Sequence, residues 1–225
     1  MKKSVLLTRS KSANKELKEK LGSENFDFVE CNLIKYKLFP VDAEYINKFS
    51  DLIITSNFAA NNIPDAPRPY MSVWVVGQKS ASELENKGYK VEFYASSADN
   101  LKKQFPEKLY KTMLYLSGYH ITVNMPLGIT RKILYKTKYL ESLSIKQVTR
   151  YKQGIDYIVL YSENCAKTLL KLLVENNLVN YLENTTIIAI SSKVGKVLEQ
   201  VFKNVVVSHG SDSMLKHIEK HDRKD

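Results

Sequence analysis

The second half of the chain repeats the pattern of the first. The stretch DLIITSNFAANNI, which begins at Asp51, resembles DYIVLYSENCAKTL, which begins at Asp156. Each contains an acidic residue, an apolar strand, a serine at the end of that strand (Ser56 or Ser162) and a helix-like segment. Further along, VWVVGQKSASEL parallels IIAISSKVGKVL. The sequence therefore contains two copies of one strand and helix unit, and we expect two similar domains.

Short apolar strands alternate with amphipathic helices along the whole chain. For example, SVLLT is followed by SANKELKEKLG, in which Leu17 and Leu21 fall four residues apart on one helical face. This alternation predicts α/β domains in which helices cover both faces of a parallel sheet. CNLIKYKLFP and SIKQVTRYKQ flank the first complete copy, and we expect them to pair as a two-stranded connector.

The expected organisation is a discontinuous domain with a second domain inserted into it. Its parts are an α/β domain of residues 1–35 and 152–225, an inserted α/β domain of residues 39–146, and connector strands near 33–39 and 145–152.

The charge of the chain favours an anionic partner. Thirty-four Lys and Arg residues against 24 Asp and Glu give a formal net charge of +10, and such a field attracts anions from solution. The basic residues are spread along the chain, and no helix-turn-helix, zinc-finger or RNA-binding motif is present, so no nucleic acid partner is expected. An excess of lysines on solvated faces is the alternative explanation of the charge.

Several classes of protein are disfavoured by what the sequence lacks. No run approaches the roughly 18 to 20 apolar residues of a membrane span, so we expect a cytoplasmic protein with no membrane partner. We also expect a monomer. Cys31 and Cys165 are expected to be reduced, buried thiols. His217 and His221 form an i,i+4 pair near the C-terminus, for which a solvated helix is a better explanation than a metal site. Neither a P-loop nor a dinucleotide fingerprint is present.

From end to end, the chain resembles the uroporphyrinogen-III synthase family. The resemblance lies in the order and spacing of VLLTR, DLIITSNFAANNI, VWVVGQKSASELENKGYKVEF, SADNLKKQF, LYLSG, QVTRYKQ, DYIVLYSENCAKTLLKLL and IIAISSKVGKVLEQ. It implies two flavodoxin-like domains joined by a two-stranded ladder. It also implies a lyase of heme biosynthesis that closes the linear tetrapyrrole hydroxymethylbilane into uroporphyrinogen III, inverting ring D without a metal or an organic cofactor.

The substrate that the family implies carries eight carboxylates, and hydroxyls and helix N-termini at the carboxyl ends of parallel strands can bind them. Gly77 would let the backbone approach a carboxylate closely, although a plain strand-to-helix turn is the alternative. The expected substrate-binding residues are Thr8, Arg9, Thr55, Ser56, Gly77, Ser80, Ser117, Gly118, Ser162, Ser191 and Lys193.

Tyr151 is the expected catalytic residue. In QVTRYKQ it matches the tyrosine that the family carries at the exit of the connector strand, facing the cleft. A phenol can donate a hydrogen bond to the departing hydroxyl of the substrate. A tyrosine that only packs is the alternative, since the chain has 14 tyrosines.

Two segments depart from the family's pattern. Where the family commonly reads GPTTA, this chain has the segment 191–195, in which Lys193 is either a carboxylate partner or a solvated lysine. LSGYHIT lacks the arginine that often follows the glycine; His120 can serve there, or it is a surface histidine. A non-catalytic α/β protein that binds a polyanion or nucleic acid, and a family member that has lost activity, are the alternatives to an active enzyme.

Overall fold

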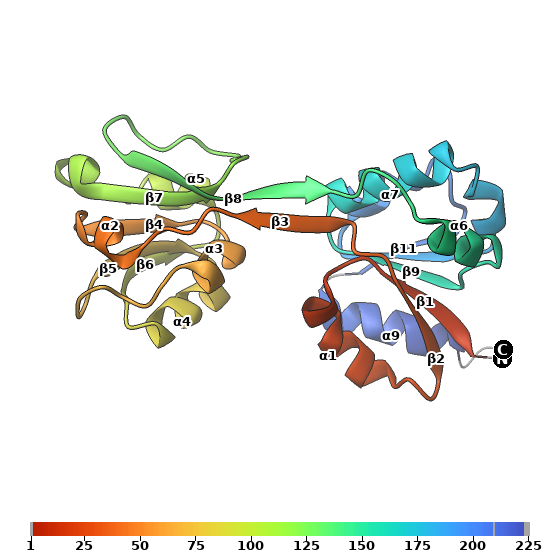
Figure 1. The fold of residues 1–225 in the computed structure, drawn as a ribbon. Coiled ribbons are helices and arrows are strands. Elements are labelled where there is room, and N and C mark those ends of the chain that lie inside the picture. The colour runs from red at the N-terminus through yellow and green to blue at the C-terminus, as the bar shows by residue number, and fades with distance from the viewer. Residues whose placement is uncertain (1, 209, 223–225) are drawn as a thin grey trace. The chain divides into compact units, whose positions relative to one another are not determined.

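The chain forms two compact α/β units. A computed structural model describes residues 2–208 and 210–222 (Figure 1). Unit 1 is made of residues 1–35 and 138–225, and unit 2 of residues 36–137. A segment in the middle of the sequence is thus inserted into a domain that the two ends of the chain build together.

Unit 1 contains one five-stranded parallel sheet with helices on both faces. Its elements are β1 (Lys3–Leu7), α1 (Lys11–Leu21), β2 (Phe26–Glu30), α6 (Ile145–Lys152), β9 (Tyr157–Leu160), α7 (Glu163–Glu175), the 3-10 helix η2 (Val179–Leu182), β10 (Thr186–Ala189), α8 (Ser192–Gly195), β11 (Val205–Val207) and α9 (Ser211–Asp222). The strand order is β11-β10-β9-β1-β2, and every pairing is parallel. In chain order this is the arrangement 2-1-3-4-5 of flavodoxin-like folds, which the family resemblance implies.

Neighbouring residues of a strand in unit 1 pack on opposite faces of the sheet. Leu6 joins the core beneath α6, α7 and α8, whereas Leu7 joins the core beneath α1 and α9. Both side chains are fully buried. Because both faces are covered, the strands read as continuous apolar runs, which is why SVLLT and DYIVL are recognisable in the sequence.

Unit 2 is built on the same plan with one extra strand. Its elements are β3 (Ile34–Leu38), which begins in unit 1, α2 (Ala43–Asn47), β4 (Asp51–Ile54), α3 (Asn57–Asn62), β5 (Ser72–Val76), α4 (Gln78–Asn86), β6 (Lys90–Ala95), α5 (Ala98–Lys102), the 3-10 helix η1 (Glu107–Thr112), β7 (Met113–Gly118) and β8 (Thr130–Tyr139). The strand order is β3-β8-β7-β4-β5-β6, and the pairings among β4 to β8 are parallel.

The two sheets correspond strand for strand in their topology. Each has a central strand, β4 or β9, with the next two strands of the chain on one side: β5 and β6, or β10 and β11. On the other side stand β7 and β8 in unit 2, and β1 and β2 in unit 1. The duplication seen in the sequence is therefore a duplication of the fold.

The second connector strand is β8, and the segment that we expected to form it is a helix. The chain crosses between the units in β3 and in β8, where Phe39 N donates to Leu134 O (2.7 Å) and Leu140 N donates to Leu33 O (3.0 Å). These two bonds give one antiparallel register. The second boundary accordingly lies at residues 137 and 138, before the expected 145–152.

SIKQVTRYKQ forms α6 because its start is a helix signal. Ser144 Oγ accepts from Gln147 N, and the Gln147 side chain accepts from Ser144 N, which makes a capping box. Val148 and Tyr151 then fall three residues apart and both pack into the core of unit 1. The β-branched residues of the segment suggest a strand, but the cap and the helical spacing decide the structure.

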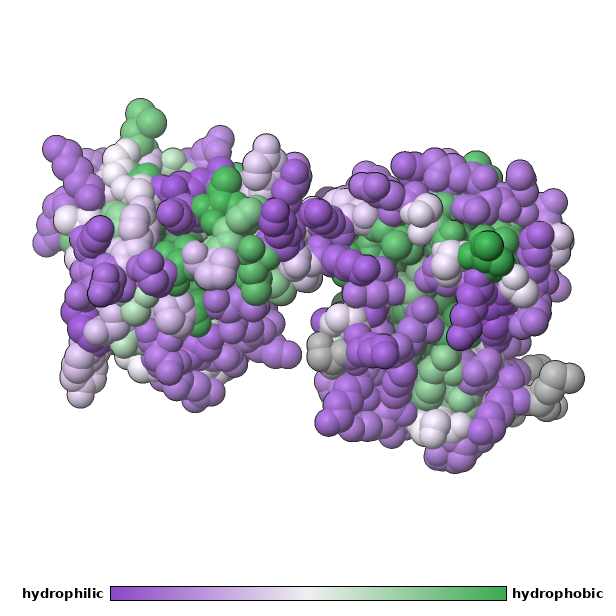
Figure 2. All heavy atoms as spheres, in the orientation of Figure 1, coloured by the Kyte–Doolittle hydropathy of each residue, from purple (hydrophilic) through white to green (hydrophobic). Residues whose placement is uncertain are grey.

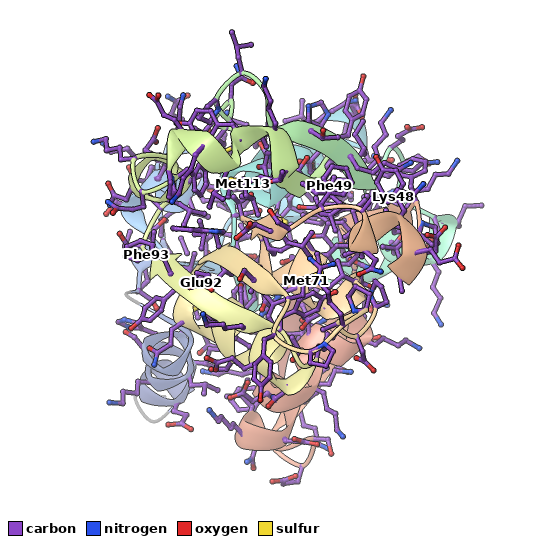
Figure 3. The ribbon with its side chains drawn as sticks, turned by 90° about the vertical axis from the view of Figure 1, so that its left-hand side faces the viewer. Lys48, Phe49, Met71, Glu92, Phe93 and Met113 are labelled. Carbon is purple, nitrogen blue, oxygen red and sulfur yellow. The ribbon has the colours of Figure 1, made fainter. Side chains whose placement is uncertain are left out.

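Apolar side chains close the amino ends of the strands in unit 2. Figure 3 looks onto this edge: Met113 begins β7, and Met71 directly precedes β5. Both methionines are buried. The predicted substrate-binding residues of unit 2 lie at the other edge of the sheet. None of the described helices combines the length and apolar character that crossing a membrane requires.

Candidate active site

Each sheet has one point at which the order of its strands reverses. It lies between β4 and β7 in unit 2, and between β1 and β9 in unit 1. Ligands of open parallel sheets bind outside the carboxyl ends of the strands at such a point. Several predicted residues meet there: Thr55, Ser56, Ser117 and Gly118 in unit 2, and Thr8, Arg9 and Ser162 in unit 1.

Thr55 and Tyr115 bridge the two strands of the reversal point in unit 2. The Thr55 Oγ1 and Tyr115 OH atoms are 2.8 Å apart. Burial raises the pKa of Tyr115, and the hydrogen bond with Thr55 opposes this only in part. The phenol therefore remains protonated at neutral pH, and it holds Thr55 in one orientation.

The hydroxyl oxygen of Ser56 accepts hydrogen bonds from two protein groups. Its Oγ accepts from Ala59 N (3.1 Å), which caps α3, and from the hydroxyl of Tyr135 (3.1 Å). A serine hydroxyl has two acceptor positions and one donor. Because two protein donors already bond to the oxygen, its own proton is suited to an incoming acceptor such as a carboxylate. Ser56 is half-buried, so a ligand can reach it.

Ser117 is buried, and its hydroxyl accepts a hydrogen bond from Arg131. Arg131 Nε donates to Ser117 Oγ (2.8 Å), and Ser117 Oγ donates to Gly118 O (3.0 Å). Arg131 also donates to the carbonyls of Gly118 (2.7 Å) and Tyr119 (2.8 Å). The sequence suggested Ser117 as a ligand-binding hydroxyl, but the group that carries charge to this place is Arg131.

A guanidinium lies beside Gly118 although no arginine directly follows this glycine in the sequence. The motif LSGYHIT has no arginine after its glycine, yet the guanidinium of Arg131 reaches this glycine from the neighbouring strand β8. His120 is exposed, and its ring stands edge-on to the ring of Tyr119 at 5.0 Å. Sequence reasoning missed Arg131 because its position is set by strand pairing.

Gly118 is required for packing. A Cβ atom at this position would lie 2.8 Å from the ring of Tyr135, closer than any ordinary contact. The absence of a side chain lets the ring lie over the end of β7 and reach Ser56. Gly118 therefore positions the candidate site through Tyr135.

Gly77 makes the turn between β5 and α4. Its φ is 85°, a value that favours glycine. No side chain caps α4 at this position, and within the first turn Ser80 N donates to Gly77 O (3.1 Å). Ser80 is 3% exposed, and its hydroxyl therefore lies beneath this turn.

In unit 1 the equivalent reversal point carries a cation above an aromatic ring. Thr8 is fully buried, and its hydroxyl donates to Val159 O (2.7 Å), which ties β1 to β9. Arg9 is exposed, and its guanidinium carbon lies 4.6 Å from the ring centroid of Tyr161. A cavity of about 30 Å³ beside Arg9 and Tyr161 has room for about one water molecule. Arg9 thus presents its charge to solvent, while Thr8 does not.

In unit 1 the starts of helices α7 and α8 are joined by an ion pair. Ser162 Oγ caps α7 by accepting from Cys165 N (3.2 Å). Glu163 binds Lys167 (2.5 Å) and Lys193 (3.1 Å), and hydrogen bonds from these two lysines, Lys167 first, lower the pKa of Glu163. Lys193 is thus a carboxylate partner already, but its carboxylate belongs to the protein. Ser191 precedes α8 and makes no side-chain cap.

Tyr151 lies in α6 and does not face an open cleft. Its side chain is fully buried, and its hydroxyl lies beside the thiol of Cys31 without a hydrogen bond of good geometry. Burial, and then the neighbouring Cys31, raise the pKa of Tyr151. The expectation that this tyrosine sits at a strand exit was wrong, because the segment is helical. Its catalytic role stays a prediction.

The remaining expectations concern thiols and histidines. Cys31 and Cys165 are free and buried, as predicted. His217 belongs to α9, and the side chain of His221 lies outside the described residues.

Comparison with known proteins identifies the family. Residues 41–216 match the family model described as uroporphyrinogen-III synthase HemD. The uncharacterized protein RP474 of Rickettsia prowazekii (strain Madrid E) is 34% identical, over 91% of this chain and 92% of its own length.

Two solved structures share the fold. The uroporphyrinogen-III synthetase of Helicobacter pylori 26695 has a TM-score of 0.60 at 16% identity, covering 98% of this chain and 100% of its own. A mutant uroporphyrinogen III synthase of the extremely thermophilic bacterium Thermus thermophilus has a TM-score of 0.53 at 14% identity, covering 99% of this chain and 100% of its own. With the family model matching most of the sequence, the chain belongs to the uroporphyrinogen-III synthase family.

Proposed function

We propose that this chain is an active uroporphyrinogen-III synthase that cyclises hydroxymethylbilane to uroporphyrinogen III, with inversion of ring D and loss of water. Family membership supports the reaction class. The observation that carries the proposal is the placement of donors and cations at the reversal points of both sheets, where Ser56 and Arg9 are available to a ligand. A substrate with eight carboxylates needs such groups at several places.

The reaction makes modest demands on acid-base chemistry. Loss of the substrate hydroxyl gives an azafulvene, which ring D attacks at its substituted carbon. The resulting spiro intermediate fragments and closes in the opposite sense. Unassisted closure gives the type I isomer, so the protein must hold the chain in the geometry that favours spiro attack. The strand-end groups supply this by fixing carboxylates.

Ser56 is the best placed hydroxyl for this task. Two protein donors fix its oxygen, so its proton has one direction left, and donation to a carboxylate needs no rearrangement. Arg9 offers a guanidinium stacked on Tyr161, which restricts its motion. Arg131 contributes positive charge beside Gly118 while its N–H groups hold the loop.

The direct test is the isomer formed from freshly prepared hydroxymethylbilane. We expect the purified protein to yield uroporphyrinogen III faster than the substrate closes by itself, with the type III fraction rising with enzyme concentration. Type I product at the spontaneous rate would contradict the proposal and would favour a family member without activity or a polyanion-binding protein.

We further propose that the enzyme works as a cytoplasmic monomer without a metal or an organic cofactor. The expected outcome is full activity after exhaustive treatment with a chelator and after removal of small molecules by gel filtration. Activity that chelation abolishes and added metal restores would overturn this part of the proposal.

Tyr151→Phe tests whether this residue assists departure of the hydroxyl. A positioned acid contributes about 10² to 10⁴-fold, so a catalytic Tyr151 predicts a fall of at least tenfold in type III formation, with type I rising. Stability should hold or rise slightly, because the variant removes a buried hydroxyl without a good partner. Full type III output from the variant would remove Tyr151 from the mechanism. Product isomers and a melting curve provide both measurements.

A further inference from the structure

Three aromatic side chains form a cluster on unit 2, and one of them, Tyr135, also packs against the core of that unit. Tyr36 of β3 stacks on Phe58 of α3 with ring centroids 3.9 Å apart and an interplanar angle of 28°. Tyr135 of β8 stands edge-on to Phe58 at 4.8 Å and to Tyr36 at 5.6 Å. We call these three residues the aromatic cluster. Tyr36 is 45% exposed.

The surface around the cluster is apolar on one side and basic on the other. The register of β3 and β8 places Tyr36 and Leu38 on the same face as Tyr135, and Leu38 is 40% exposed. Lys37 and Lys136 alternate with these residues and project from the opposite face. Figure 2 shows hydrophobic residues gathered on unit 2 where β3, β8 and α3 come together, within a largely hydrophilic surface. Exposed apolar patches of this kind mark binding sites.

The cluster is continuous with the candidate active site. Tyr135 is a member of the cluster and also donates its hydroxyl to Ser56. Phe58 follows Ser56 by two residues in the first turn of α3. Gly118 leaves the space that the ring of Tyr135 fills. An aromatic ring surface and the hydroxyl of Ser56 therefore lie side by side.

We propose that the aromatic cluster binds one pyrrole ring of the tetrapyrrole substrate, with Tyr36 as its exposed ring, while Ser56 receives a carboxylate substituent of the same pyrrole. This inference rests on the proposed function. A pyrrole is a flat, electron-rich ring, and offset or edge-on packing against another aromatic ring suits it. Each pyrrole of the substrate carries two carboxylates, so the ring and an acid group reach the protein together. Binding both fixes the rotation of that pyrrole, which positioning for spiro attack requires.

Tyr36→Leu is the decisive variant. It keeps an apolar side chain at an exposed position, so the fold should survive, but it removes the stacked ring. We expect the KM for hydroxymethylbilane and the Kd for uroporphyrinogen III, kept reduced and measured by titration calorimetry, to rise about three- to tenfold. Tyr36→Phe retains the ring and should stay close to the wild type. Tyr94→Leu removes an aromatic ring that is 54% exposed on β6, and it serves as the matched control.

The two measurements separate failure of this inference from failure of the proposed function. Wild-type turnover with unchanged KM and Kd in Tyr36→Leu would overturn the inference and leave the function standing. No turnover in the wild type, but uroporphyrinogen III binding that Tyr36→Leu weakens, would overturn the function and support the cluster as a tetrapyrrole site. Absence of both turnover and binding would overturn both. Stacking also holds nucleic-acid bases, so a short single-stranded oligonucleotide is the competing probe. The inference would likewise be overturned if the wild type bound the oligonucleotide but not the tetrapyrrole, and if Tyr36→Leu lost the oligonucleotide binding.

Discussion

The two reversal points, between β4 and β7 in unit 2 and between β1 and β9 in unit 1, share one strand topology but differ in their side chains. In unit 2 the hydroxyls of Thr55 and Ser56 are held by tyrosines from β7 and β8 beside an open aromatic surface. In unit 1 the equivalent edge carries ions, with Arg9 stacked on Tyr161 and Glu163 paired with two lysines. The duplicated fold sets where functional groups stand, and the side chains of each copy set what they bind.

The acidic residue that begins both copies serves the fold. Asp51 is 6% exposed and accepts from Ser50 (2.6 Å) and from the indole N–H of Trp74 (3.1 Å). Asp156 is exposed and accepts from the backbone N–H and the hydroxyl of Ser4 (both 2.7 Å). Each carboxylate ties the amino end of a central strand to a neighbour, at the edge away from the candidate site. Repetition in a sequence therefore marks structural needs as well as ligand contacts.

The largest effect should come from Gly118→Ala, which tests the aromatic surroundings of the strand ends in unit 2. The new methyl group would collide with the ring of Tyr135. Displacing that ring should cost about 1 to 3 kcal/mol of stability and should weaken substrate binding. Urea unfolding and the KM for hydroxymethylbilane measure the two effects. Adding Tyr135→Leu should restore stability but not binding, because it makes room for the methyl group without replacing the phenol. Stability equal to that of the wild type would show that the ring can move freely.

A smaller effect separates the two equivalent serines. Ser56→Ala and Ser162→Ala each remove a helix N-cap and should each cost about 1 kcal/mol of stability. Only Ser56→Ala should also raise KM, by several-fold, because two protein donors already bond to the Ser56 oxygen and leave its proton for a ligand, whereas the Ser162 hydroxyl lies against the thiol of Cys165. Melting curves and steady-state kinetics on the pair provide the measurements. An equal rise in KM for both variants would mean that the two copies bind ligand alike.

The smallest effect concerns the ion pairs at the strand ends of unit 1. Glu163→Gln frees Lys193 from a pair in which the lysine is 81% exposed, so the melting temperature should hardly change, because solvent screens such pairs. If Lys193 then meets a substrate carboxylate, KM should fall about two- to threefold. Glu183→Gln frees Lys203 in the same way and serves as the control. An unchanged KM in Glu163→Gln would assign Lys193 to the surface alone.

The pH dependence of that effect follows from the pKa of Glu163. Hydrogen bonds from Lys167 and Lys193 lower this pKa, so the carboxylate is charged throughout the neutral range, and the difference between the variant and the wild type should be constant there. The pairing is fully present above the ordinary pKa of a glutamate and is lost as the pH falls through the lowered value. A difference that varies across neutral pH would point to another titrating group.

The fold and the strand-end positions could be predicted from the sequence, whereas the partners in the site could not. Buried parallel strands read as apolar runs, and the hydroxyls that end them are visible as SNF and SEN. The tyrosines that hold Thr55 and Ser56 stand 60 and 79 residues away in the chain. Only strand pairing brings them together, so no local pattern could reveal them. Tyr151 was misplaced for a local reason, since a capping box at Ser144 outweighed a strand-like composition.

The insertion of unit 2 into unit 1 has a consequence for folding during synthesis. Unit 2 is one continuous stretch of chain, so all of its strands are synthesised before β9. The first strands of unit 1 must wait for partners far downstream: Ser4 bonds to Asp156, which lies 152 residues later. Contacts this distant in sequence close slowly. We therefore expect the inserted unit to fold first and to bring the two ends of the chain closer together. Pulse-labelled hydrogen exchange would reveal this order as earlier protection of β4 than of β9.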